Sequence, residues 1–101
     1  MAISEQMAET LRSDLGFEPG LSEKRMFGAL CFLIHGNMVA GLDSSGAFYR
    51  PGKAGLERAL ALPGVTRMMN GARPMGGFVR LDDDGFDDDL TRETLTEMSF
   101  A

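Results

Sequence analysis

The sequence has few of the residues that form disulfides, metal sites or catalytic pairs. It contains one cysteine, Cys31, one histidine, His35, and no tryptophan. A lone cysteine cannot form an internal disulfide, so we expect a reducing compartment, the cytoplasm. The longest apolar run, ALCFLI, has six residues, whereas a membrane-spanning helix needs about 20. The opening stretch, MAISEQMAETLRSD, contains acids and lacks the apolar core of a secretory signal, so we expect no membrane association.

Positive charge is also scarce. The chain has ten Lys and Arg residues and 15 Asp and Glu residues, which gives a formal net charge of −5. Nucleic-acid binding draws much of its affinity from neutralising phosphates with Lys and Arg, so this composition argues against direct nucleic-acid binding. Eight of the ten basic residues are arginine, a residue suited to shaped ion pairs.

The order of apolar patterns predicts a single α+β domain over residues 1–101. Ile3, Met7, Leu11 and Leu15 recur every four residues and predict a helix that ends at Gly16. Further patterns predict a meander of three or four strands over 24–50, a helix over 53–62, strands over 65–69 and 77–82, and a helix over 87–101. Because the strands form hairpins instead of alternating with helices, we expect an antiparallel sheet with helices at both ends and one between strands.

Two of these elements carry sharper expectations. In the strand ALCFLI both faces are apolar, which predicts a central strand covered on both sides, by helices or by another subunit. Gly36-Asn37 is a two-residue turn signal, and it would place Phe32 opposite Gly41, Ile34 opposite Val39 and His35 opposite Met38. The terminal helix would carry Leu90, Thr94, Leu95 and Met98 along its length.

Cys31 and His35 could be a thiol nucleophile and its base. On a strand, residues four apart lie about 13 Å from each other, whereas the pair needs contact at about 3 Å. We therefore expect no catalytic residues in this pair, with Cys31 a small buried side chain and His35 at the end of a hairpin.

Two motifs come close to cofactor sites without completing them. DDDGFDDD resembles a calcium loop, but Arg80 and Thr91 occupy its first and last ligand positions, so we expect no metal and aspartates that cap a helix. GARPMGGF resembles a phosphate loop, but Gly77 and Phe78 stand where lysine and a hydroxyl are needed. We expect no cofactor, and an exposed glycine-rich loop over 70–77 from which Arg73 and Met75 project.

Methionines and arginines are the candidate binding residues. Met26, Met38, Met68, Met69 and Met75 flank strands and loops, where they could fill the core or form an adaptable contact surface. Arg25, Arg50 and Arg73 could clamp an anion or carboxylate, or could pair with the surplus acids. The candidate ligand or partner site comprises Arg25, Met26, Phe27, Arg50, Arg73 and Met75.

Four segments, taken in order, carry a family resemblance. KRMFGALCFLIHGNMVAGL, ALALPGV, GARPMGGFVRL and an acidic terminal helix together resemble the N-terminal domain of the TfoX/Sxy proteins, bacterial regulators of competence for DNA uptake. The resemblance implies an α+β fold similar to secretion chaperones, dimerisation through the sheet, and no catalytic residues. We therefore expect a non-enzymatic regulatory or protein-interaction module that forms a homodimer. The alternative is a small-anion or carboxylate-binding domain that uses the strand-end arginines and the glycine loop.

Overall fold

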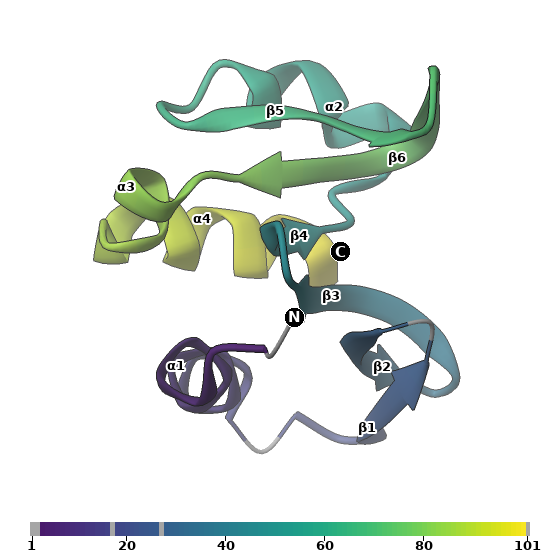
Figure 1. Ribbon diagram of the computed structural model, residues 1–101, viewed down its shortest axis with the longest axis vertical. Helices are drawn as coiled ribbons and strands as arrows, with labels where there is room; N and C mark the ends of the chain where they lie inside the picture. The colour runs from purple at the N-terminus through teal and green to yellow at the C-terminus, as the bar shows by residue number, and fades with distance from the viewer. Residues whose placement is uncertain (1–2, 17, 27, 101) are drawn as a thin grey trace.

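The computed structural model describes residues 3–16, 18–26 and 28–100. Its elements are α1 (Glu5–Leu15), β1 (Leu21–Met26), β2 (Ala29–Ile34), β3 (Asn37–Asp43), β4 (Gly46–Tyr49), α2 (Gly52–Leu60), β5 (Val65–Asn70), β6 (Arg73–Leu81), α3 (Asp83–Phe86) and α4 (Asp89–Phe100). All strand pairs are antiparallel, in the spatial order β1-β2-β3-β4-β6-β5 (Figure 1). This arrangement confirms the predicted α+β class.

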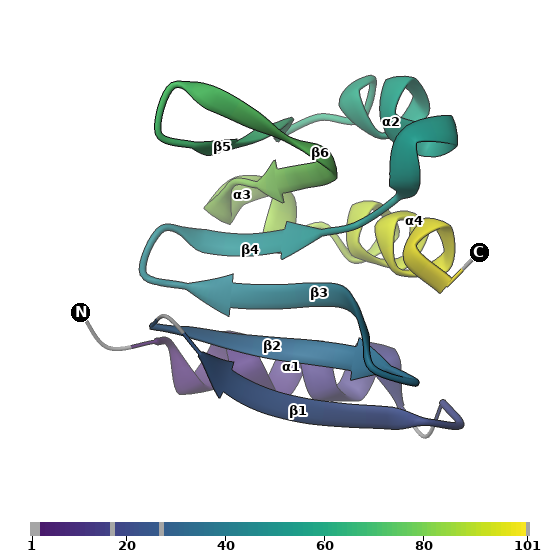
Figure 2. The same cartoon turned by 90° about the vertical axis from the view of Figure 1, so that its right-hand side faces the viewer.

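The helices lie on one side of the sheet. In Figure 2 the strands cross the front of the molecule, and α1 and α4 run behind them. The main core fills the space between these layers, and Leu11 of α1, Phe32 of β2 and Leu95 of α4 are each fully buried in it. None of the described helices is long and apolar enough to cross a membrane.

The first helix forms as its apolar spacing predicts. The hydroxyl of Ser4 accepts a hydrogen bond from the Met7 N–H at 3.2 Å and caps the helix. Gly16, at a φ of 61°, ends it. Ala8, Leu11 and Leu15 form its buried face.

The predicted turn of the β2–β3 hairpin is wrong by one residue, and the pairing beside it is wrong by two, since Ile34 lies opposite Asn37 and not Val39. The turn consists of His35 and Gly36, both at positive φ (50° and 84°), so Asn37 opens β3 opposite Ile34. The His35 N–H donates to the Gly20 carbonyl at 3.1 Å, which holds the turn in this position. A bulge further along the strand reduces this difference to one residue.

That bulge lies between Phe32 and Leu33, and it places Phe32 opposite Ala40 and Cys31 opposite Gly41. The expected stacking of Phe32 on Gly41 is therefore wrong. A bulge inserts one residue into a strand without any turn motif to mark it, so the spacing of apolar residues alone did not reveal it.

The expected glycine-rich loop over 70–77 is also wrong. Strand β6 already begins at Arg73, which pairs with Asn70, and Met69 pairs with Pro74. Only the Gly71-Ala72 turn separates β5 from β6. Arg73 and Met75 thus lie on a strand, because antiparallel pairing with β5 extends the sheet through the glycines.

The predicted terminal helix is confirmed, and its leucines differ in exposure. Leu90 is 71% exposed, whereas Leu95 is fully buried. Asp88 caps the helix by accepting from the Leu90 N–H at 3.0 Å and from the Thr91 hydroxyl at 3.1 Å. The cap holds the Thr91 side chain in a buried position. Because neighbouring residues on a helix point in different directions, Leu90 then points toward solvent.

Arg92 of α4 links this helix to α1 and to α3. Its Nε donates to Asp14 of α1 at 2.8 Å, and its Nη1 donates to the Phe86 carbonyl at 2.7 Å. Its guanidinium also lies 5.4 Å from the centre of the Phe86 ring. The side chains of Arg92 and Asp14 are only 12% and 21% exposed, and removing one partner of a shielded charge pair costs more than removing one partner of a surface pair.

Replacing Arg92 with alanine should lower the free energy of unfolding by about 2 kcal/mol, because the change removes an ion pair and a bond to a carbonyl in a shielded site. Urea denaturation followed by circular dichroism measures this change. Arg12→Ala is the matched control, since Arg12 pairs with Glu9 and Glu23 at the surface and should lose less than about 1 kcal/mol. Equal losses in the two variants would refute the anchoring role of Arg92.

Candidate functional site

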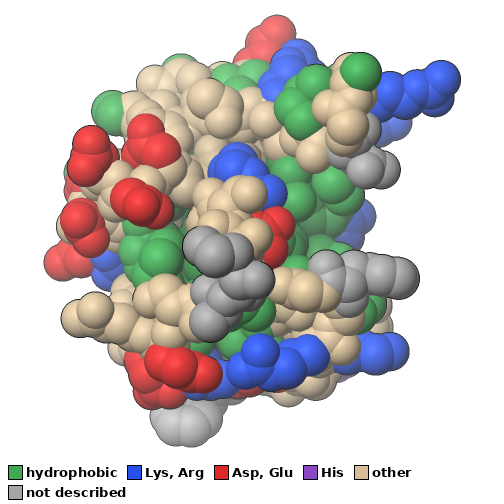
Figure 3. Space-filling view, in the orientation of Figure 1, with side chains coloured by type: hydrophobic (Ala, Val, Ile, Leu, Met, Phe, Trp, Pro, Cys, Tyr) green, Lys and Arg blue, Asp and Glu red, His purple; other side chains and the backbone are tan. Residues whose placement is uncertain are grey.

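The face of the sheet opposite the helices carries a second apolar cluster. Cys31, Phe48 and Met68 form its buried centre. Met26, Ala29, Leu33, Met38, Met75 and Phe78 pack around that centre and are partly exposed. We call this surface the open face. Figure 3 shows hydrophobic side chains inside a hollow on the right of the molecule, between the places where Figure 1 draws the β5–β6 hairpin above and β1 and β2 below.

The open face contains a hollow of about 480 Å³. Its lining comprises Met26, Ala29, Cys31, Met38, Asp43, Phe48, Met68, Met69, Met75 and Arg80. All five methionines singled out in the sequence therefore meet at one place, although they come from four different strands. Met69, at 49% exposed, is one of two large apolar side chains that face solvent among the described residues.

A glycine lies against the ring of Phe48, one of the residues that line the hollow. Gly41 pairs with Phe48 across β3 and β4, and a Cβ at position 41 would lie 2.2 Å from the Phe48 ring. An aromatic ring over a cross-strand glycine was expected, but the ring belongs to Phe48. Phe78 packs against it at a centroid distance of 6.4 Å. The missing side chain at Gly41 thus lets Phe48 lie flat on the sheet.

One polar pair borders the hollow. Arg80 donates to both carboxylate oxygens of Asp43, at 2.9 and 3.0 Å, and to the Gly46 carbonyl at 3.2 Å. Neither Arg80 nor Asp43 is among the candidate site residues predicted from the sequence. The alternation Phe78-Val79-Arg80 could have placed Arg80 at this site, because side chains two apart on a strand point to the same face as each other.

Cys31 and His35 lie in separate surroundings. Cys31 is 2% exposed within the open face, and burial, followed by the nearby charge of Asp43, raises its thiol pKa above the ordinary value. A reactive cysteine needs the opposite shift. The His35 imidazole lies against Gly20 instead, where a Cβ would come within 2.4 Å of the ring.

The structure does not gather the three candidate arginines. Arg25 lies on β1, 3.8 Å from Glu5 of α1. Arg73 begins β6 at the tip of the β5–β6 hairpin. Arg50 follows β4 and lines a different cavity. Of the other candidates, Met26 and Met75 line the hollow, and Phe27 lies outside the described residues.

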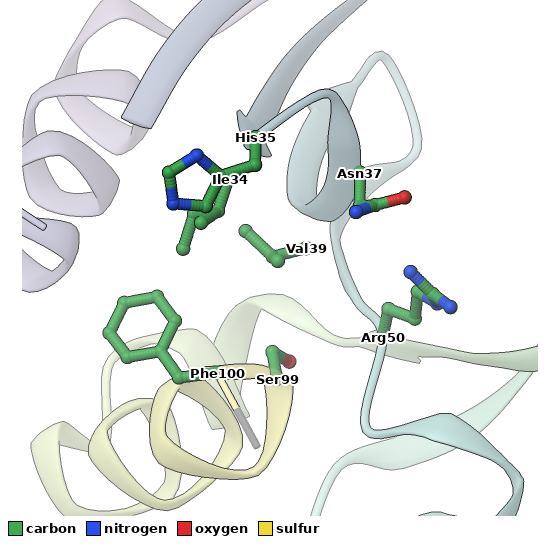
Figure 4. Close-up of a pocket in the computed structure, with 7 residues that line it drawn as sticks. All are labelled: Ile34, His35, Asn37, Val39, Arg50, Ser99 and Phe100. Atoms are coloured by element: carbon green, nitrogen blue, oxygen red, sulfur yellow. The ribbon is translucent and has the colours of Figure 1, made fainter. Parts of the chain in front are cut away.

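Figure 4 shows the cavity that contains Arg50. Its volume is about 320 Å³, and it is lined by Ile34, His35, Asn37, Val39, Arg50, Ser99 and Phe100. These residues come from the β2–β3 hairpin, the end of β4 and the last turn of α4.

The aspartates after β6 act as helix caps. Asp82 accepts from the Gly85 N–H at 2.7 Å at the start of α3, and Asp88 caps α4 as described. Within residues 3–16, 18–26 and 28–100, no group of three or more His, Cys, Asp or Glu side chains is placed to hold a metal ion.

These observations define a single α+β domain with an apolar, methionine-lined sheet face on its surface. A protein-family model described as the TfoX N-terminal domain matches residues 15–101. The chain therefore belongs to the TfoX N-terminal domain family, whose members are competence-regulator-like domains. No curated protein and no solved structure gives a significant match.

Gly41→Ala should disturb the hollow, because the added methyl group would displace the Phe48 ring. We expect a loss of about 1–3 kcal/mol in unfolding free energy, as for other overpacked cores, and a change in the near-ultraviolet signal of the aromatic residues. Gly76→Ala is the control, since a Cβ there meets only the end of Lys53 at 3.8 Å. If Gly41→Ala is as stable as Gly76→Ala, Phe48 does not require the glycine.

The Cys31 thiol should react slowly with a disulfide reagent such as dithionitrobenzoate in the folded protein. Its raised pKa lowers the thiolate fraction near neutral pH, so the rate should rise only at higher pH than for a free cysteine. Stopped-flow labelling across pH, with and without urea, measures this difference. A native rate equal to the urea-unfolded rate at pH 8 would contradict the burial of Cys31.

Proposed function

We propose that this domain is a non-enzymatic regulatory module that binds other protein chains through the open face. The observation that carries the proposal is the gathering of five methionines around one hollow on the uncovered side of the sheet. Methionine side chains are flexible and polarizable, so they suit surfaces that repack against a partner. Apolar patches of this kind on a folded domain mark interaction sites.

A second copy of the chain is the partner we propose first. Two open faces meeting around a twofold axis would each bury the other's methionines, which is the isologous contact typical of homodimers. Arg80 and Asp43 already neutralise each other within one copy, so the centre of such a contact brings no unpaired charge into the interface. The dimer would act in the reducing cytoplasm, where Cys31 stays a thiol.

Family membership supports the regulatory part of the proposal. The TfoX N-terminal domain matches 15–101, nearly the whole chain, so this sequence carries the regulator-like domain. Regulation by this chain would then occur through the proteins that it contacts. The raised pKa of Cys31 and the separate surroundings of His35 support the absence of catalysis by that pair.

Met69→Glu should abolish self-association, because it would bury a carboxylate without a partner against the methionines of the second copy. Light scattering during size-exclusion chromatography, over a range of protein concentrations, should show a dimer for the natural sequence and a monomer for the variant.

Leu90→Glu is the matched control. Leu90 is as apolar and even more exposed, at 71%, but it lies on α4, away from the open face. This variant should dimerise like the natural sequence. A natural sequence that stays monomeric at millimolar concentration, or a dimer that Leu90→Glu disrupts and Met69→Glu does not, would overturn self-association through the open face.

A further inference from the structure

The cavity beside Arg50 has the charge of an anion site. Among its lining side chains Arg50 carries a full positive charge, and none of them is a carboxylate. The ion pairs found within the described residues do not include Arg50. Within the described residues its guanidinium therefore has donors left for another group. The planar guanidinium matches a carboxylate with two parallel hydrogen bonds.

Ser99 supplies a second, independent sign of a ligand. Its side chain is only 7% exposed, it lines the cavity, and its Oγ has no hydrogen-bond partner within the described part of the chain. A serine inside a helix commonly bonds to the carbonyl four residues earlier, and here it does not. Leaving a buried polar group unpaired costs about 1–3 kcal/mol, so a partner at this position would recover that cost.

The remaining lining residues indicate that the ligand has an apolar part. Ile34, Val39 and Phe100 provide an apolar wall, and Figure 4 shows these side chains on the side of the cavity away from Arg50. A fully hydrated, doubly charged phosphate would meet one cation and much hydrocarbon. A carboxylate with a short apolar body would match both sides of the cavity, whose volume of about 320 Å³ lies at the small end of ligand sites.

We propose that this cavity binds a small monocarboxylate with an apolar body. Arg50 holds the carboxylate, and the Ser99 hydroxyl and the Asn37 amide supply further hydrogen bonds. Ile34, Val39 and Phe100 contact the apolar part. His35 is held against Gly20 and borders the cavity, so a ligand there would contact the β2–β3 turn and α4 together.

Titration with hexanoate, followed by amide chemical shifts in nuclear magnetic resonance spectra, tests the proposal on the whole chain. Shifts should concentrate at residues 34–39, 50 and 98–100. Hexanamide, which has the same apolar body without the charge, and inorganic phosphate, which has the charge without that body, should each bind at least tenfold more weakly. Equal binding of either compound would overturn the assignment of a monocarboxylate.

Two variants locate the site. Arg50→Gln should weaken hexanoate binding at least tenfold, and Arg73→Gln, at the tip of another hairpin, should leave it unchanged. Ser99→Ala should weaken binding several-fold while the melting temperature stays equal or rises, because the variant removes an unpaired buried hydroxyl. Hexanoate binding that survives Arg50→Gln, or that falls equally with Arg73→Gln, refutes the site. Neither result bears on dimerisation through the open face.

Discussion

One constraint shapes this molecule: the central strands are apolar on both faces, but the helices cover only one. In β2, Leu30 and Phe32 point into the main core beneath α1 and α4, and Cys31 points to the opposite cluster. A sheet of this kind buries less apolar surface than its sequence offers, and the hydrophobic effect favours removing the remainder from water. Within one chain, the methionine side chains pack around Cys31, Phe48 and Met68 and remove part of this apolar surface from water.

The parts of the fold governed by local periodicity could be predicted. The four-residue spacing from Ile3 to Leu15 predicted α1, and alternation in ALCFLI predicted a strand with two apolar faces. The errors occurred where a contact distant in sequence decides the geometry. Gly20 fixes the turn at His35 through its carbonyl, and pairing with β5 extends β6 through a glycine-rich segment that resembles a loop.

The candidate site shows the same limit. The methionines were singled out as candidate contact residues, but they span positions 26 to 75 and come together only through the order of the strands. The ion pair of Asp43 with Arg80 joins strands that are not adjacent in the chain, so no spacing rule could reveal it. The three arginines, in contrast, were grouped as strand-end residues. Strand ends can lie far apart in a sheet, and the strand order puts three strands between Arg25 on β1 and Arg73 on β6.

The bond between Arg92 and Asp14 has a consequence for synthesis of the chain. The two residues are 78 positions apart, and the ribosome makes the N-terminal partner first. Until α4 emerges, α1 lacks its anchor, and both sides of the early strands lie open to water and to other chains. The nascent polypeptide therefore exposes surface prone to aggregation until α4 docks.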